Sequence, residues 1–210
     1  VTIVPRRGEI AGVRAFDTGP GVVLIDSLTD MLVGQRYDPG GGFARMGEPI
    51  DVVVEELLTH EYFRREPPKS TGREMFSDAY AVALLEACRI AEPECSDADI
   101  LATATEFTAR SIAQAYERFI PEPLADVLVS GGGAKNTYLM ERLRESLSSS
   151  GSQLAVRNLQ FFDEVFFPGE AKEALSFAFL GFLHLRNEPG NVPNATGARG
   201  PRVLGKRIPA

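Results

Sequence analysis

The segment from Phe16 to Gly21 combines an acidic residue with two glycines at the point where an apolar run ends. Because glycine has no side chain, Gly19 and Gly21 let backbone N–H groups approach an anion closely. The carboxylate of Asp17 is suited to hold Mg²⁺, directly or through water. The segment therefore indicates a site for a metal-bound phosphate, while a tight turn with a capping Asp explains the same residues equally well.

The triplet Asp17-Thr18-Gly19 is also found in aspartic proteases, in which two carboxylates share a proton. Those proteins are mainly β-structured, and Ser or Thr normally follows the triplet. In this chain Pro20 follows it, the triplet occurs once, and helical patterns dominate. These features argue against a protease.

Three consecutive glycines, Gly131, Gly132 and Gly133, follow the apolar segment 124–129 and precede a helical pattern. A strand, a glycine turn and a helix in this order let the backbone lie flat against a planar or phosphorylated ligand. Asn136 can cap the helix or form a hydrogen bond with the ligand. The spaced glycines of the dinucleotide fingerprint are incomplete, and a turn that simply allows close helix–strand packing is an equally good interpretation.

Charged residues in two further segments are candidates for ligand contacts. Lys69 and Arg73 lie in the Pro-rich segment 67–74, and either can meet a phosphate or a sugar hydroxyl. The same segment also has the residue spacing of a helix capping box. Glu173 falls in the first turn of a predicted helix, where the helix dipole ordinarily accounts for an acidic residue.

Hydrophobic periodicity predicts the elements that must position these residues. We expect a β-hairpin over residues 2–16, an ordered glycine-rich loop over 34–47, and a loop over 188–210. A capping box formed by Ser96 and Asp99 marks the start of the longest helix. The order of the elements argues for an α/β domain. The predicted helices cover 22–32, 51–59, 77–90, 97–119, 136–147 and 171–185, and the predicted strands cover 124–129 and 154–156.

Composition limits the classes of protein to which the chain can belong. Hydrophobic residues make up 44% and charged residues 24% of the 210 residues, which is typical of a globular protein and not of a disordered one. The net charge of −7 argues against nucleic acid or an anionic membrane surface as a partner. Two Cys and two His exclude a disulfide framework and a His-based metal site. No apolar run is long enough for a membrane helix, and we expect a cytoplasmic protein.

Taken together, these segments resemble the anhydro-N-acetylmuramic acid kinases, which belong to the sugar kinase and actin-like ATPase superfamily. The matching blocks occur in the family's order and span nearly the whole chain. They are FDTGPG (16–21), YDPGGGFARMG (37–47), PPKSTGREMF (67–76), ATATEFTARSIA (102–113), GGGAKN with Leu139-Met140 (131–140), KEALSFAFLG (172–181), and NVPNATGA with VLG (191–205).

The resemblance implies an α/β fold, namely the C-terminal lobe of an actin-like ATPase (ribonuclease H-like) sugar kinase, with a mixed sheet flanked by helices. Residues 1–210 would form this single nucleotide-side lobe. The resemblance implies that the N-terminal lobe, which carries the family's catalytic Asp, lies outside these residues, so we expect no catalytic residue here and a chain that is inactive alone. ATP and Mg²⁺ are the expected cofactors.

The resemblance also assigns roles to the candidate site residues. Asp17, Gly19 and Gly21 would lie near the phosphates, with Asp17 as the metal ligand. Gly131, Gly132, Gly133 and Asn136 would face the adenosine. Glu173 would lie at the sugar end of the cleft, and Lys69 and Arg73 are further candidates for substrate contacts. Two departures from the family's pattern affect local ligand geometry: Val22 replaces an Asn, and Phe166 replaces a Gly.

Family enzymes transfer a phosphoryl group from ATP to the 6-oxygen of an anhydrosugar, while water opens the 1,6-anhydro ring. The sugar would be anhydro-N-acetylmuramic acid, as in cell-wall recycling, or levoglucosan. The TGA block at 196–198 favours the first. The expected partners are the missing N-terminal lobe and, since family members are often dimers, a second copy of the chain. A non-catalytic nucleotide-binding or interaction module is the alternative function.

Overall fold

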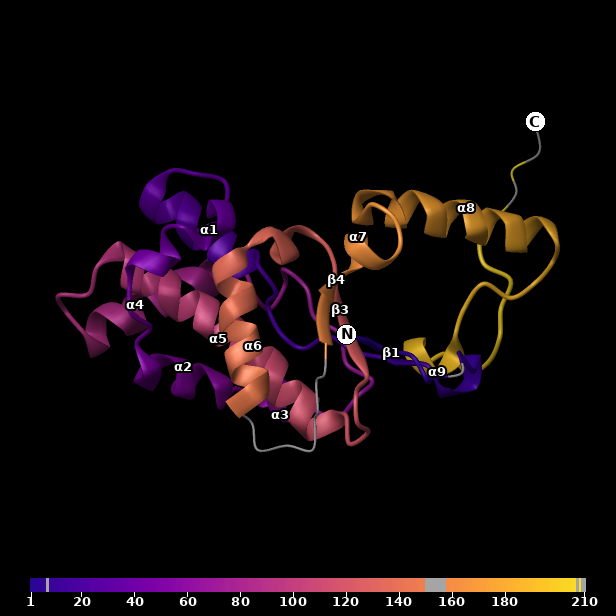
Figure 1. Ribbon diagram of the computed structural model, residues 1–210, viewed down its shortest axis with the longest axis horizontal. Coiled ribbons are helices and arrows are strands. Elements are labelled where there is room, and N and C mark those ends of the chain that lie inside the picture. Colours follow the sequence, from indigo (N-terminus) through magenta and orange to yellow (C-terminus); the bar gives the residue numbers. More distant parts are fainter. Residues whose placement is uncertain (7, 150–157, 207, 209–210) are drawn as a thin grey trace. The chain divides into compact units, whose positions relative to one another are not determined.

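The computed structural model describes residues 1–6, 8–149, 158–206 and 208, and it divides into two compact units (Figure 1). We call them the helical unit, formed by Thr18–Glu66 and Thr71–Phe161, and the terminal unit, formed by Val1–Asp17, Pro67–Ser70 and Phe162–Ala210. The residues of each unit mainly contact other residues of the same unit. The expectation of a single lobe over residues 1–210 stays a prediction.

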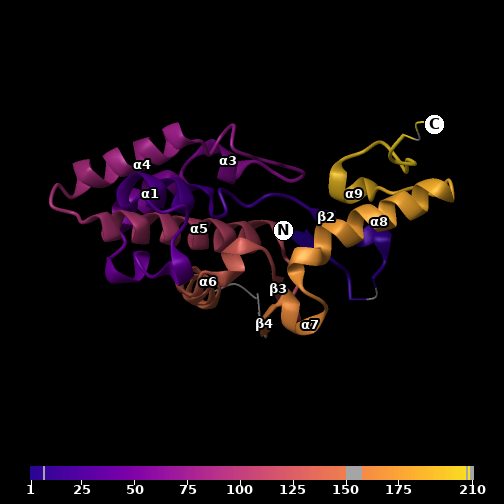
Figure 2. The same ribbon diagram turned by 90° about the horizontal axis from the view of Figure 1, so that it is seen from above.

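The helical unit is built around the long helix α5, Asp97–Phe119 (Figures 1 and 2). Its apolar side chains are almost completely excluded from solvent, among them Ile100, Leu101 and Phe107. Four helices pack against α5, namely α1 (Val23–Val33), α2 (Asp51–Leu58), α4 (Asp78–Ala91) and α6 (Thr137–Ser149). The core of this unit therefore lies on all sides of one helix.

Hydrogen bonds at its N-terminus explain why α5 begins at Asp97. The hydroxyl of Ser96 accepts a hydrogen bond from the backbone N–H of Asp99 at 3.2 Å, and the Asp99 carboxylate accepts one from the N–H of Ser96 at 2.7 Å. This reciprocal pair satisfies N–H groups that a helix start leaves without an intrahelical partner. The predicted capping box is confirmed.

The glycine-rich stretch after α1 is ordered, as predicted. It contains the 3₁₀ turns η2 (Pro39–Gly41) and η3 (Ala44–Met46). The buried carboxylate of Asp38 holds the stretch together, because it accepts hydrogen bonds from the N–H groups of Phe43 at 2.9 Å and Ala44 at 3.0 Å. The sequence pattern did not predict the short helix α3 (Glu61–Arg64), which places Tyr62 and Phe63 in an aromatic cluster with Phe76, Tyr80 and Phe107.

A parallel strand pair precedes and follows α6 in the chain. Strand β3 (Asp126–Val129) pairs with β4 (Asn158–Phe161), and Val127 lies opposite Leu159. The strand predicted at 154–156 lies outside the described residues. Because β3 ends at Val129, the three glycines follow the carboxyl end of a strand and lead into a helix, as the sequence predicts.

The terminal unit contains the predicted hairpin, in which β1 (Thr2–Ile3) pairs antiparallel with β2 (Arg14–Ala15) and η1 (Ile10–Gly12) lies in the connection. Its C-terminal part comprises α7 (Phe162–Val165), η5 (Gly169–Ala171), α8 (Lys172–Leu185) and α9 (Pro193–Thr196). Helix α9 lies in the stretch predicted as a loop. Proline is favoured at the first position of a helix, and this explains why the Pro-containing stretch can start one.

The architecture confirms the α/β class at a coarse level, with many helices and small sheets. Within the described part of the chain the strands form one antiparallel and one parallel pair. No helix of that part is long and apolar enough to cross a membrane. The finer assignment to the C-terminal lobe of an actin-like ATPase stays a prediction.

Candidate functional site

The turn at residues 18–21 is fixed on the surface of α5. The hydroxyl of Thr108 donates a hydrogen bond to the carbonyl oxygen of Gly21 at 2.9 Å. A Cβ atom at Gly19 would lie 2.8 Å from the Ser111 Oγ, so only glycine allows the chain to lie this close to the helix. Gly21 has a φ of +59°, which favours glycine, and α1 begins two residues later. Helix α5 thus positions the turn that leads into α1.

The second glycine turn, at the end of β3, also requires glycine. Gly131 has a φ of 91° and a ψ of −176°, a backbone conformation that is essentially restricted to glycine. The 3₁₀ turn η4 (Gly132–Lys135) follows directly. The N–H groups of the first residues of a helical turn have no partner within it. Gly132 and Gly133 therefore present their backbone donors at the start of η4.

The two glycine turns are neighbours within the helical unit. A Cβ atom at Gly133 would lie 2.9 Å from the Val22 Cγ1, and Val22 directly follows Gly21. By contrast, Cβ atoms at Gly21, Gly131 and Gly132 would meet no heavy atom within 4 Å. The structure thus brings the two glycine segments, residues 18–21 and 131–133, together and leaves space beside three of their glycines. We call these two segments the paired glycine turns.

The electrostatic surroundings of the paired glycine turns suit an anion. The start of α1 follows Gly21, and a helix N-terminus carries partial positive charge. Burial raises the pKa of Asp26, in the first turn of α1, while the charges of Arg73 and Arg36 oppose this change. The backbone donors of the two turns and the start of α1 fit the phosphates of a nucleotide, whereas the acidic side chain of Asp26 opposes an anion at this helix start.

Asn136 acts as a helix cap. Its Oδ1 accepts a hydrogen bond from the N–H of Leu139 at 2.9 Å, and the residue is 7% exposed. A Cβ atom at Gly41 would collide with the Asn136 side chain, so the ordered loop packs directly on this cap. The capping interpretation is thus confirmed, and a contact between Asn136 and adenosine stays a prediction.

Of the remaining sequence-predicted site residues, Asp17, Lys69 and Glu173 belong to the terminal unit, whereas Arg73 belongs to the helical unit. The N–H of Asp17 donates a hydrogen bond to the carbonyl oxygen of Lys69 at 3.0 Å, and Lys69 is buried. Glu173 lies in the first turn of α8 and is exposed. Asp17 and Lys69 are thus neighbours through their backbones. The roles proposed for Asp17, Lys69, Arg73 and Glu173 stay predictions.

No group of three or more His, Cys, Asp or Glu residues within the described ranges could hold a metal ion. This does not argue against Mg²⁺ at Asp17, because Mg²⁺ is commonly held by one or two carboxylates together with substrate phosphates. Asp17 as a single protein carboxylate fits that mode of binding.

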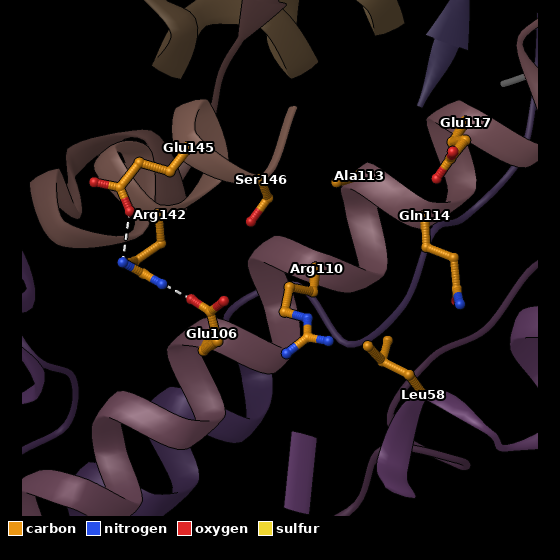
Figure 3. A pocket seen from close by; sticks show the side chains of 9 residues that line it. All are labelled: Leu58, Glu106, Arg110, Ala113, Gln114, Glu117, Arg142, Glu145 and Ser146. Atoms are coloured by element: carbon orange, nitrogen blue, oxygen red, sulfur yellow. Dashed lines mark hydrogen bonds and ion pairs between the residues drawn. The ribbon is translucent and has the colours of Figure 1, made fainter. Parts of the chain in front are cut away.

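A separate cavity of about 430 Å³ lies between α5, α6 and the end of α2 (Figure 3). The Arg142 Nε donates a hydrogen bond to the Glu106 Oε2 at 2.6 Å, and the Glu106 side chain is only 6% exposed. This hydrogen bond raises the pKa of Arg142. None of the lining residues was a site candidate from the sequence, because a buried acid inside an apolar helix pattern becomes recognisable only when its partner helix is known. The lining residues are Leu58, Glu106, Arg110, Ala113, Gln114, Glu117, Arg142, Glu145 and Ser146.

Comparison with known proteins gives a consistent result. Residues 3–210 match the model of the family described as anhydro-N-acetylmuramic acid kinase. A relative of that name from Microcystis aeruginosa is 44% identical over 96% of this chain and 52% of its own length. Relatives of the same name from Bacillus cereus and from Francisella tularensis subsp. novicida are each 36% identical over 98% of this chain. The chain spans about half the length of these relatives, namely 52% and 51% of the last two.

Proposed function

Because the chain belongs to the anhydro-N-acetylmuramic acid kinase family, we propose that it is the C-terminal, nucleotide-binding half of an ATP-dependent kinase that acts on 1,6-anhydro-N-acetylmuramic acid. The observation that carries this proposal is the contact between the two glycine turns, in which Gly133 lies against Val22. Two segments more than a hundred residues apart in the sequence thereby form one face of exposed backbone. Such a face suits a nucleotide, since backbone donors can reach the phosphates without a side chain in the way.

In this proposal the paired glycine turns hold the nucleotide. The backbone N–H groups around Gly21 and at Gly132 and Gly133 donate to the phosphates and ribose, and the start of α1 adds its partial positive charge. Arg73 is a further candidate for a contact with the substrate, as the sequence suggests. When bound, ATP would supply the phosphoryl group. Asp17 is the carboxylate that we propose as the Mg²⁺ ligand.

The sugar contacts would come from the terminal unit and from the part of the kinase that this chain does not span. Glu173, exposed in the first turn of α8, would orient the sugar or the water. Lys69 is a second candidate, but its burial favours a role in holding the Asp17 turn through the backbone hydrogen bond between the two residues. An aspartate of the other half would remove a proton from the water that opens the anhydro ring. The chain alone would bind nucleotide without catalysing phosphoryl transfer.

The printed name of all three relatives contains N-acetylmuramic acid, and this favours that sugar over levoglucosan. An enzyme that uses ATP for this reaction would work in the cytoplasm. Whether the kinase forms a homodimer stays a prediction.

Reconstitution tests the proposed function. The chain is mixed with the part of the Microcystis aeruginosa relative that lies outside the matched region, and ADP release is measured with and without 1,6-anhydro-N-acetylmuramic acid and with levoglucosan. We expect ADP release that depends on the first sugar and on both halves. ADP release with levoglucosan alone would change the proposed substrate. If no sugar gives ADP release although the two halves bind one another, the proposed activity is wrong.

The variant Gly132→Ala separates nucleotide binding from folding in the same experiment. Its Cβ atom would meet nothing within 4 Å and Gly132 does not have a positive φ, so the fold should be unaffected. The new methyl group would instead occupy the space beside the exposed backbone. We expect MgATP affinity, measured by calorimetry, to fall about 10-fold or more, since a change of ~1.4 kcal/mol suffices for a factor of ten. Affinity equal to that of the wild type would remove Gly132 from the site.

A further inference from the structure

A second cavity of the helical unit is lined mainly by charged and polar side chains. It has a volume of about 350 Å³ and lies between the end of α2, the short helix α3 and the C-terminal half of α5. Its described lining residues include three arginines, Arg64, Arg110 and Arg118, and a single carboxylate, that of Glu55. All of them belong to the helical unit, so this unit alone forms the cavity. We call it the arginine cavity.

Arg110 is held in place at the wall of the arginine cavity. Its Nη1 lies 3.2 Å from the Asp51 Oδ1, and its Nη2 lies 3.8 Å from the Glu55 Oε1. The two acids are four residues apart on α2, so they lie on the same face of that helix. The positive charge of Arg110 therefore already has partners within the protein. A guanidinium that is fixed in this way loses little freedom when a ligand binds.

The other two arginines have no carboxylate partner in the part of the chain that the structure describes. No ion pair there engages Arg64 or Arg118, whereas each arginine outside this cavity that forms an ion pair has a carboxylate oxygen within 2.9 Å. The Arg118 guanidinium lies over the ring of Phe119, 5.5 Å from its centroid. Arg64 directly follows the buried Tyr62 and Phe63, which fix the backbone of α3. Two uncompensated positive charges thus line one cavity, in a chain whose net charge is −7.

The size and the neutral lining of the arginine cavity suit a small ligand. Gln114 lies on α5 one turn from both Arg110 and Arg118, and its amide adds a neutral donor. Figure 3 shows the side chains of Arg110 and Gln114 extending from α5 on the side where Leu58 lies. Sites for small molecules begin at about 300 Å³, so this cavity is at the lower end of their range.

The neighbouring cavity of Figure 3 shows that the excess of positive charge is local. That cavity shares Arg110 with the arginine cavity, but three carboxylates line it, those of Glu106, Glu117 and Glu145. Its second arginine, Arg142, is in ion pairs with two of them. Electrostatic attraction therefore favours an anion in the arginine cavity and opposes one in its neighbour.

The chemistry of the lining indicates which anion fits. Guanidinium groups bind phosphate oxygens through paired N–H donors. A phosphate group carries about −1.5 to −2 charges at pH 7, which matches two uncompensated guanidiniums, whereas a single carboxylate carries only one charge. We propose that the arginine cavity is a second anion site, which binds a phosphate dianion as the free ion or as the phosphate group of a small ester. It shares no residue with the paired glycine turns and does not depend on the proposed function.

The test compares two double variants of the whole chain by calorimetry, with inorganic phosphate and with methyl phosphate as ligands at constant ionic strength. Arg64→Gln with Arg118→Gln removes the two uncompensated charges. Arg65→Gln with Arg144→Gln is the matched control, because it removes two charges from exposed arginines that do not line the cavity. All four side chains are exposed, so folding should be retained, and circular dichroism verifies it. Gly132→Ala reports on phosphate at the paired glycine turns.

We expect the wild type, the control and Gly132→Ala to bind at least one of the two ligands with affinities within about 3-fold of one another. The Arg64→Gln, Arg118→Gln variant should bind at least about 10-fold more weakly, because it lacks two charged donors. Binding of methyl phosphate identifies an ester as the ligand, and binding of inorganic phosphate alone identifies the free ion. No saturable binding of either ligand by the wild type, equal binding by the cavity variant, or an equal loss in the control would overturn the inference. A loss with Gly132→Ala but not with the cavity variant would overturn it too, since the phosphate would then lie at the glycine turns.

The pH dependence tests the charge of the ligand. The second pKa of a phosphate group is about 6, while arginine stays protonated. Affinity for the phosphate ligand should therefore rise about 4-fold from about pH 5.5 to about pH 7.5, as the dianion forms. Sulfate, which is a dianion at both pH values, serves as the control and should show no such rise. Equal affinity for phosphate at the two pH values would contradict a site for the dianion.

Discussion

Gly133 and Val22 make the contact on which the nucleotide site depends. The segment after Gly131 turns so that Gly133 has no room for a side chain on the side of Val22. Val22 departs from the family's pattern, but its place in the sequence does not predict this contact. The reason is physical, because the contact joins residues far apart in the sequence and no local pattern encodes it.

A double-mutant cycle at these two residues measures the contact. Gly133→Ala would place a Cβ atom 2.9 Å from the Val22 Cγ1, and we expect it to destabilise the chain by about 1–3 kcal/mol, as overpacking does. In a Val22→Ala background the same change should be neutral or stabilising by up to about 1 kcal/mol, because alanine restricts the unfolded chain more than glycine does. Urea unfolding of the four proteins gives the coupling free energy.

Equal destabilisation by Gly133→Ala in both backgrounds would show that the turns do not touch. The paired glycine turns would then lose their structural basis, whatever the nucleotide affinity of the wild type.

Several residue-scale predictions could be made from sequence because they concern local geometry. The need for glycine at Gly21 and Gly131 follows from their place between an apolar run and a helix, and both have a positive φ. The buried pair of Glu106 and Arg142 could not be predicted, since it joins α5 to α6 across the cavity. The role of Asn136 could not be predicted from the sequence, because a helix cap and a ligand contact differ only in the direction in which the same side chain points.

At the scale of elements, the start of α5 controls how the ordered loop is attached. The Asp99 carboxylate accepts hydrogen bonds from the N–H of Glu48, at 2.7 Å, and from the N–H and hydroxyl of Ser96, each at 2.7 Å. These hydrogen bonds lower the pKa of Asp99, and the one from the N–H of Glu48 makes the largest contribution. The helix cap and the preceding loop thus share one carboxylate.

Asp99→Asn tests this shared cap. We expect a loss of about 1–2 kcal/mol of unfolding free energy at pH 7, in the range of a lost cap and its hydrogen bonds. Because the pKa of Asp99 is lower in the folded state, the carboxylate contributes its stability above the unfolded pKa, near 4, and this contribution is lost as the pH falls through the folded pKa. The difference between wild type and variant in urea unfolding should therefore shrink below about pH 4.

Asp97→Asn is the matched control, because the Asp97 carboxylate forms an exposed ion pair with Arg89. Exposed pairs contribute about 0–1 kcal/mol, so this variant should stay close to the wild type at neutral pH. A difference between Asp99→Asn and the wild type that is independent of pH would contradict the role of the carboxylate charge.

The helices were predictable as elements because each carries a strong periodic pattern or cap. Helix α5 was predicted over the same residues that it occupies, 97–119. Helix α3 was missed, since four residues are too few to show a period. Helix α9 was missed because Pro and Gly throughout its segment favoured a loop, and packing on β2 and η1 outweighs that preference.

At the scale of the molecule, the division into two units could not be predicted from the sequence. The terminal unit gathers segments from both ends of the chain and from residues 67–70. The hydrogen bond from Asp17 to Lys69 and the one from the Asn194 side chain to the Ala11 carbonyl oxygen hold these segments together. Such long-range contacts leave no periodic signal. The family could be predicted nonetheless, because its glycine blocks occur in order along the chain.

The central claim is that the paired glycine turns of the helical unit bind the nucleotide. Amide chemical shifts of the ¹⁵N-labelled chain, recorded while a non-hydrolysable ATP analogue and Mg²⁺ are added, test it most directly. We predict saturable shifts at Gly21, Gly131, Gly132 and Gly133, with little change at Glu106 and Arg142 in the separate cavity. Shifts confined to that cavity, or no shifts at the four glycines at saturating nucleotide, would contradict the claim.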